Sequence, residues 1–155
     1  MKSIIYVGLD VHQDSVTMAH VPQDAREANE PVTLPNDPAK IRRALQRLTK
    51  DGSELRICYE AGGCGYVLQR HIASWGHVCE VIAPSLIPKR SGDRRKTDRR
   101  DAVKLALLYR AGDLTPIHIP DEAQEAVRSL VRCREAYTRE IVAGRSPQGV
   151  VEAQQ

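Results

Sequence analysis

Two aspartates three residues apart, Asp98 and Asp101, are the residues of this 155-residue chain best placed to do chemistry. If Thr97 caps a helix, both carboxylates lie on one face of its first turn, and Leu105 and Leu108 continue that face toward a core. Carboxylates crowded in this way repel each other and are costly to bury unpaired, so a divalent cation is their natural partner. The competing interpretation is a solvated surface on which the acids complement the helix dipole and neighbouring arginines.

The segment around these two acids is strongly basic. From residue 89 to residue 110, nine basic residues stand against three acidic ones, a net charge of +6, so the rest of a chain of charge +3 carries −3. A basic cluster around acids is expected of a site that holds a polyanion while coordinating metal. The side chains predicted to contact nucleic acid are Lys89, Arg90, Arg94, Arg95, Lys96, Arg99, Arg100 and Lys104. A solubilising charged loop is the alternative.

Two further carboxylates stand at the ends of predicted strands. The apolar run 4–9 ends abruptly in Asp10, and the run 55–59 ends in Glu60, just before a glycine-rich turn at 61–65. The carboxyl ends of strands are where α/β sheets place their chemistry. We therefore expect both carboxylates at the same edge of a sheet.

Together the four carboxylates could form one metal site, made of Asp10, Glu60, Asp98 and Asp101. Hard oxygen ligands of this kind suit Mg²⁺ or Mn²⁺. Two such ions could activate an attacking hydroxyl and stabilise the leaving oxygen when a phosphodiester is cut. His12 could touch a metal or a phosphate, but a lone histidine after a strand is more often structural.

The composition favours an α/β fold with one principal domain. Hydrophobic residues make up 41% and charged residues 28%, as in ordinary globular proteins, and with no Phe the core must come from Val, Ile, Leu and Ala. The predicted strands are 4–9, 15–21 (antiparallel to the first), 32–34, 55–59 and 78–83. The predicted helices run from Pro38 to near Gly52, from Val67 to Gly76, from Asp98 to near Gly112, and from a cap at Asp121 onward, with a basic loop at 84–95.

The cysteines and the hydropathy pattern limit the class of protein. Four cysteines fall in no zinc-binding spacing, no apolar stretch approaches the length needed to cross a bilayer, and the first residues do not form a signal peptide. We expect reduced cysteines, a cytoplasmic location and no membrane association.

Five motifs give the chain a resemblance to a known family. They are Gly-Leu-Asp-Val-His at 8–12, Tyr-Glu-Ala-Gly at 59–62, Ala-Pro-Ser-Leu-Ile-Pro-Lys at 83–89, Lys-Thr-Asp-Arg-Arg-Asp-Ala at 96–102 and Arg-Ala-Gly-Asp-Leu-Thr-Pro at 110–116. In this order they resemble the N-terminal domain of DEDD-type insertion-sequence transposases, and the match at 96–102 is highly specific. The resemblance implies an RNase H-like (RuvC-like) fold, with a mixed five-stranded sheet flanked by helices, and the same four carboxylates as metal ligands.

The resemblance also implies a function. The family recombines DNA under the guidance of an element-encoded bridge RNA, so the expected partners are DNA and a guide RNA, with homo-oligomers possible. Expected boundaries are a catalytic domain at 1–113, a linker and helix at 114–140, and a disordered tail at 141–155.

Departures from the family pattern leave alternatives open. Gln13 stands where the family often has lysine. The family also continues into a second domain with a nucleophilic serine. This sequence does not contain that domain and looks truncated or frame-shifted. A catalytically silent remnant that binds only nucleic acid is therefore the alternative function. A phosphotransferase of the actin and sugar-kinase type is disfavoured, because no second glycine-rich phosphate loop is present.

Overall fold

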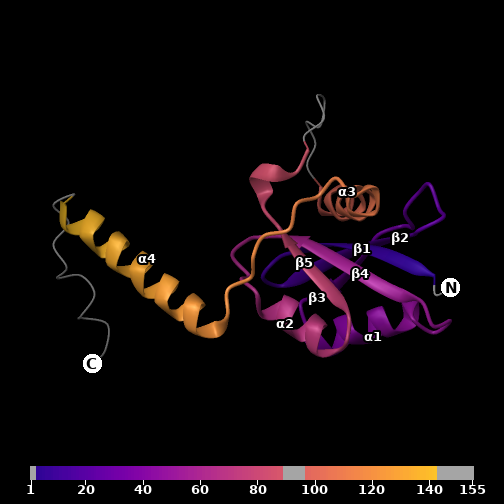
Figure 1. Ribbon diagram of the computed structural model, residues 1–155, viewed down its shortest axis with the longest axis horizontal. Helices are drawn as coiled ribbons and strands as arrows, with labels where there is room; N and C mark the ends of the chain where they lie inside the picture. The colour runs from indigo at the N-terminus through magenta and orange to yellow at the C-terminus, as the bar shows by residue number, and fades with distance from the viewer. Residues whose placement is uncertain (1–2, 89–96, 143–155) are drawn as a thin grey trace. The chain divides into compact units, whose positions relative to one another are not determined.

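The computed structural model describes residues 3–88 and 97–142. The chain divides into two compact units, Met1–His118 and Ile119–Gln155. The first unit contains a sheet with helices on both faces, and the second contains one long helix (Figure 1).

The predicted strands and helices are present in the predicted order. The strands are β1 (Ile4–Val11), β2 (Ser15–Pro22), β3 (Val32–Pro35), β4 (Glu54–Glu60) and β5 (Val78–Ile82). The helices are α1 (Pro38–Leu48), α2 (Val67–Ser74), α3 (Asp98–Ala111) and α4 (Glu122–Val142), with a 3₁₀ turn η1 (Pro84–Leu86) where a loop was predicted. Helix α1 ends at Leu48, earlier than predicted, because Thr49 leaves helical geometry and Gly52 then turns the chain with a φ of +83°.

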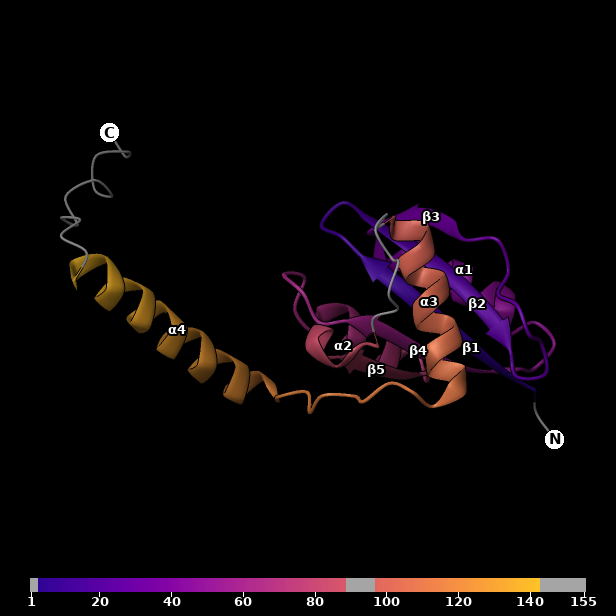
Figure 2. The ribbon, with the colours of Figure 1, turned by 90° about the horizontal axis from the view of Figure 1, so that it is seen from above.

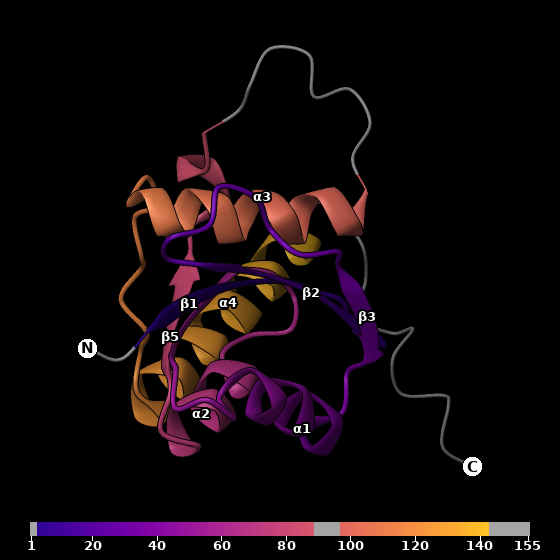
Figure 3. The same cartoon turned by 90° about the vertical axis from the view of Figure 1, so that its right-hand side faces the viewer.

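The sheet is mixed and five-stranded, in the order β3-β2-β1-β4-β5. Strand β1 pairs parallel with β4 and antiparallel with β2, and β5 continues the parallel half of the sheet. Helix α3 covers one face of the sheet, and α1 and α2 cover the other (Figure 3). These observations confirm the predicted α/β architecture.

The two faces of the sheet hold different residues because side chains alternate along each strand. On β1, Val7 and Leu9 are completely buried and share their face with Ile57, the partner of Val7 on β4. Helices α1 and α2 close this layer with apolar residues such as Ile41 and Ile72, which are also buried. This core holds the strands in register and leaves the other face for α3.

Gly8 lets α3 approach the centre of the sheet. A Cβ at residue 8 would lie 2.9 Å from Leu105 Cβ and closer still to the backbone of Ala102 and Ala106. Such a contact is shorter than side chains tolerate, so only glycine fits here without moving the helix. Viewed from above, α3 lies across β1 and β2 (Figure 2). Gly8 therefore fixes how close the start of α3 comes to the end of β1.

Helix α3 begins and ends as the sequence predicts. The hydroxyl of Thr97 accepts a hydrogen bond from the backbone N–H of Arg100 at 3.4 Å, and Gly112 ends the helix with a φ of +78°. Leu105 is buried and Leu108 packs against the apolar cluster under the helix. The predicted apolar face of this helix is confirmed.

Helix α4 lies in the second unit. It is 21 residues long, and apolar side chains such as Val127, Leu130 and Tyr137 are exposed along it. Among the described helices, none combines the length and the apolar character needed to cross a membrane.

Candidate metal centre

Asp10 stands near the carboxyl end of β1 on the face that α3 covers. It follows Gly8 by two residues, so the two positions point to the same side of the sheet. The side chain of Asp10 is 19% exposed, which makes it the least accessible member of the cluster described next. A carboxylate held on a central strand is a fixed point around which other ligands can assemble.

His12 and Asp98 join Asp10 in a compact cluster. Nε2 of His12 lies 3.1 Å from Oδ2 of Asp10 and 3.5 Å from Oδ1 of Asp98. One ligand atom from each of the three residues lies within 4.8 Å of the others, a spacing that a single metal ion could bridge. His12 and Asp98 are more than half exposed, so the cluster opens to solvent.

The hairpin between β1 and β2 fixes the backbone of His12. Its N–H donates to the carbonyl of Ser15 at 2.8 Å, and its own carbonyl accepts from Nδ2 of Asn36 at 2.8 Å. Because both backbone groups of His12 are hydrogen-bonded, the hairpin as well as the carboxylates positions the imidazole at the solvent-exposed side of the cluster.

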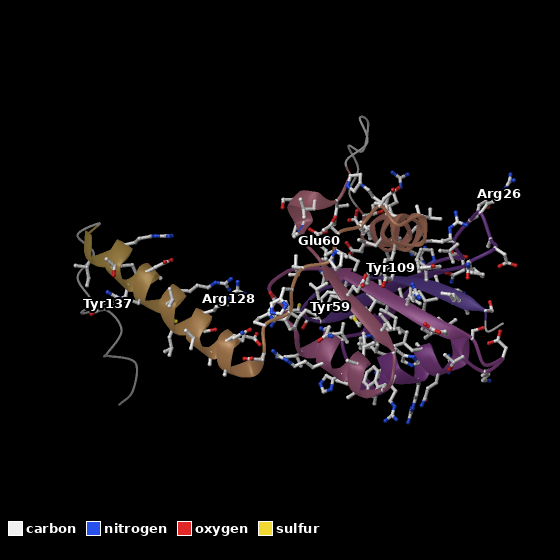
Figure 4. The ribbon with its side chains drawn as sticks, viewed as in Figure 1. Arg26, Tyr59, Glu60, Tyr109, Arg128 and Tyr137 are labelled. Carbon is white, nitrogen blue, oxygen red and sulfur yellow. The ribbon has the colours of Figure 1, made fainter. Side chains whose placement is uncertain are left out.

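Glu60 lies beside Asp10 in the sheet. Leu9 pairs with Tyr59 across the parallel strands, so the next residue along each strand is Asp10 on β1 and Glu60 on β4. Figure 4 shows Glu60 on the α3 side of the sheet and Tyr59 on the other. The backbone after Glu60 is held to β5, because the N–H of Ala61 donates to the carbonyl of Ile82 at 2.8 Å.

Asp101 lies one turn along α3 from Asp98 and is half-buried. Its charge, like that of Asp98, acts on Asp10. Within the described residues, the three-residue cluster contains Asp10, His12 and Asp98 but neither Glu60 nor Asp101. The structure thus brings two of the four predicted carboxylates into direct association with one imidazole and sets the other two close by.

Burial and charge oppose each other at Asp10. Partial burial raises the pKa of Asp10, because a carboxylate loses hydration there. His12 lowers that pKa through its charge and hydrogen bond, whereas Asp98 and Asp101 raise it, and burial outweighs the attraction of His12. The pKa of His12 is raised, chiefly by the charge of Asp10 and secondarily by Asp98. The two carboxylates thus favour positive charge at this position, whether on the imidazole or on a metal ion.

Comparison with known proteins now identifies the family. The sequence model of the DEDD transposases of the IS110 type, described as a transposase family, matches residues 7–146. The chain belongs to the DEDD transposase family. The resemblance carried by the five motifs is confirmed, and the mixed five-stranded sheet flanked by helices is the α/β architecture that it implied.

Individual relatives of this DEDD transposase chain are longer than it is. The transposase for insertion sequence element IS1533 of Leptospira borgpetersenii is 34% identical over 153 residues, which are 98% of this chain and 44% of that protein. The protein y4qE of Sinorhizobium fredii is 56% identical over 96 residues, 62% of this chain and 25% of its own length. A chain of T. thermophilus RuvC in complex with a Holliday junction substrate superposes with a TM-score of 0.49 at 11% identity, covering 74% of this chain and 99% of that chain.

The predicted nucleic-acid contacts of this transposase chain fall into two groups. Lys89, Arg90, Arg94, Arg95 and Lys96 lie outside the described residues. The other three are on α3: Arg99 and Arg100 are exposed and Lys104 is half-buried. Nη1 of Arg99 lies 3.8 Å from Oε1 of Glu30, and because both side chains are exposed this pair is a weak constraint on either.

His12 was considered from the sequence as a possible metal or phosphate contact but is not among the predicted site residues. Its signal was the spacing Asp10-Val11-His12, because residues two apart on an extended strand point to the same side. That spacing indicates a contact between His12 and Asp10, but it does not indicate the second contact of His12, with Asp98. Only the packing of α3 over β1, which brings Asp98 to the imidazole, makes His12 part of the cluster.

Proposed function

We propose that this chain is the metal-dependent catalytic domain of a DNA transposase, acting on phosphodiester bonds during transposition. The single observation that carries the proposal is the association of Asp10, His12 and Asp98 at the carboxyl end of a central strand, in a chain of the DEDD transposase family. The chain spans less than half of the length of the relatives that it matches, so the activity of the whole protein is part of the proposal.

The donor set fits a divalent cation. Asp10, Glu60, Asp98 and Asp101 offer hard carboxylate oxygens, which Mg²⁺ and Mn²⁺ prefer, and an imidazole stands at the edge of the group. The pKa of Asp10 is raised chiefly by burial, and the charges of Asp98 and Asp101 add to this effect, so a bound cation would stabilise the ionised carboxylate. When bound, Mg²⁺ or Mn²⁺ supplies charge neutralisation of the scissile phosphate and a more acidic attacking hydroxyl.

Each side chain has a distinct part in this proposal. Asp10 is the fixed ligand, because β1 is hydrogen-bonded on both sides and packed from both faces. Asp98 and Asp101 bring two further carboxylates on one rigid helix, and Glu60 brings the fourth from the neighbouring strand. His12 lies between Asp10 and Asp98, where its raised pKa favours a protonated imidazole that attracts both carboxylates before a cation binds.

The proposed function also implies binding partners for this chain. We infer that DNA lies across the exposed start of α3, where Arg99 and Arg100 lie between Asp98 and Asp101 in the sequence and can contact phosphates. A guide RNA and a homo-oligomer are proposed from family membership, together with a catalytic domain at 1–113, a linker and helix at 114–140 and a tail at 141–155. The four free cysteines are consistent with a cytoplasmic location.

Thermal unfolding with and without divalent metal tests the proposal. A ligand that binds only the folded state raises stability, so saturating Mg²⁺ or Mn²⁺ raises the melting temperature by about 5 °C. Asp10→Asn abolishes this gain, whereas Asp14→Asn, a change of the same kind at an exposed position of the neighbouring turn, preserves it. An equal gain in melting temperature in wild type and Asp10→Asn would show that the metal does not bind at this site. The absence of any gain in wild type would favour the alternative, a catalytically silent chain that binds only nucleic acid.

A further inference from the structure

Helix α1 carries a concentrated positive charge on the face of the sheet opposite the candidate metal centre. Its eleven residues contain no acid, and the exposed cations on and just beyond it are Lys40, Arg42, Arg43, Arg47 and Lys50. Ile41 and Leu45 are buried, so the helix is anchored by its inner side and only its outer side meets solvent. Figure 3 shows α1 and α3 on opposite sides of the sheet.

The two acidic residues that flank α1 accept hydrogen bonds from backbone N–H groups. Asp37 caps the helix by accepting from the backbone N–H of Lys40 at 2.9 Å, and Asp51 accepts from the backbone N–H of Ser53 at 3.1 Å. Within residues 3–88 and 97–142, none of the five cations makes an ion pair with a carboxylate. The five cations outnumber the two flanking carboxylates, so this surface keeps a net positive charge.

Helix stability does not account for the arrangement. A cation in the last turn, such as Arg47, is favoured by the helix dipole, but Lys40 lies in the first turn, where the dipole disfavours positive charge. Arg43 and Arg47 also stand four residues apart, a spacing at which like charges repel. A bound polyanion would relieve both effects.

Packing between helices holds one of these cations in place. The guanidinium of Arg42 lies 5.9 Å from the ring centroid of Trp75, at the end of α2, and the imidazole of His71 stacks on the same indole at 6.0 Å and 15°. The guanidinium of Arg42 thus has an ordered position, which a merely solubilising charge would not need.

We propose that the outer surface of α1 binds a second segment of double-stranded DNA through its phosphates, separate from the DNA at the metal centre. From Lys40 to Arg47 the helix extends about 10 Å, a length over which a duplex carries about six phosphates. The exposed side chains are lysines and arginines, which contact phosphates, and phosphate contacts position a duplex without reading its sequence. The choice of DNA over RNA rests on the proposed function.

Fluorescence anisotropy of a duplex of about 30 base pairs, titrated over a range of salt concentrations, tests this surface. The measurement is made in EDTA, so that its outcome does not depend on metal at the carboxylates. Arg43→Gln/Arg47→Gln lowers the salt slope by about two and weakens binding about tenfold at constant salt, because two phosphate contacts are lost. The control Arg26→Gln/Arg56→Gln removes the same charge from exposed positions away from α1 and changes affinity less than about twofold.

Three results would overturn the proposal. The first is an unchanged salt slope in the α1 variant. The second is an equal loss of DNA affinity in the control variant. The third is a loss of affinity that is seen only with an RNA duplex of the same sequence. Circular dichroism melts of both variants establish that each is folded at the temperature of the titration. If the α1 variant binds normally while Asp10→Asn loses its metal-linked stability, the inference on α1 fails and the metal-centre proposal stands.

Discussion

Nε2 of His12 lies 3.5 Å from Oδ1 of Asp98, so the residue that follows β1 reaches the first residue of α3. The contact joins two segments that are 86 positions apart in the sequence. It shows that the start of α3, which the motif at 96–102 singles out, is held over the end of the strand that carries Asp10.

Removal of the imidazole tests the role given to His12. His12→Gln leaves Asp10, Asp98 and Asp101 without their nearest cation, so the metal-free melting temperature falls by about 2 °C, as expected for a solvent-exposed pair. The gain on adding Mn²⁺ is as large as in wild type or larger, because the cation replaces the lost charge. A metal-linked gain that disappears with His12 would instead make the imidazole an essential ligand.

Substitution of Gly8 tests how closely α3 packs on the sheet. In Gly8→Ala the new methyl group meets the backbone of α3, and we expect a loss of about 1–3 kcal/mol in the free energy of unfolding together with a weaker metal-linked gain. Gly63→Ala is the matched control, because a Cβ at residue 63 would contact nothing within 4 Å. Chemical denaturation of the two variants with and without Mn²⁺ measures both effects. Equal stability of the two variants would show that α3 is free to shift.

Acid sensitivity of the fold follows from His20. Burial lowers the pKa of His20, so protonation is harder in the folded chain than in the unfolded chain. The unfolded state therefore binds more protons, and stability is lost as the pH falls through the ordinary histidine pKa, from about pH 7 to about pH 5. His20→Gln makes this decline shallower. Urea denaturation of the wild type and of His20→Gln at several pH values gives the slopes, and identical slopes in the two proteins would contradict the assignment.

Thiol labelling distinguishes the buried cysteines from the exposed one. Burial raises the pKa of Cys79 to about 12 and that of Cys58 well above its usual range, so neither forms a reactive thiolate near neutral pH. Cys133 is exposed on α4 and reacts at once with a disulfide reagent in the folded protein. Mass spectrometry after a short pulse locates the label, with denatured protein as the control. Rapid labelling of Cys58 would show that α3 opens readily, because the Cys58 thiol packs under Leu105.

Local sequence rules were sufficient for most of the fold. Alternating and apolar runs located the strands, and Thr97 and Gly112 correctly placed the two ends of α3, because caps act within a few residues of the helix. The early end of α1 was not foreseen, since Thr49 leaves helical geometry without glycine or proline at that position.

The candidate site depends on long-range packing that no local rule supplies. The pairing of Leu9 with Tyr59 sets Asp10 beside Glu60, and this register involves residues 50 positions apart. Inclusion of His12 depends on how closely α3 sits on β1, which is decided by the missing side chain of Gly8. The sequence identified the carboxylates as candidates, but their association with an imidazole required the tertiary structure.

A crystal structure with Mn²⁺, using the anomalous scattering of the metal to locate it, tests the central claim most directly. We expect an anomalous peak within coordination distance, about 2.0–2.6 Å, of carboxylate oxygens of Asp10 and Asp98, with Glu60 or Asp101 completing the ligand set. In Asp10→Asn crystals the same peak should disappear. A peak elsewhere on the chain, or one that persists without the Asp10 carboxylate, would contradict the assignment of this cluster as the metal centre.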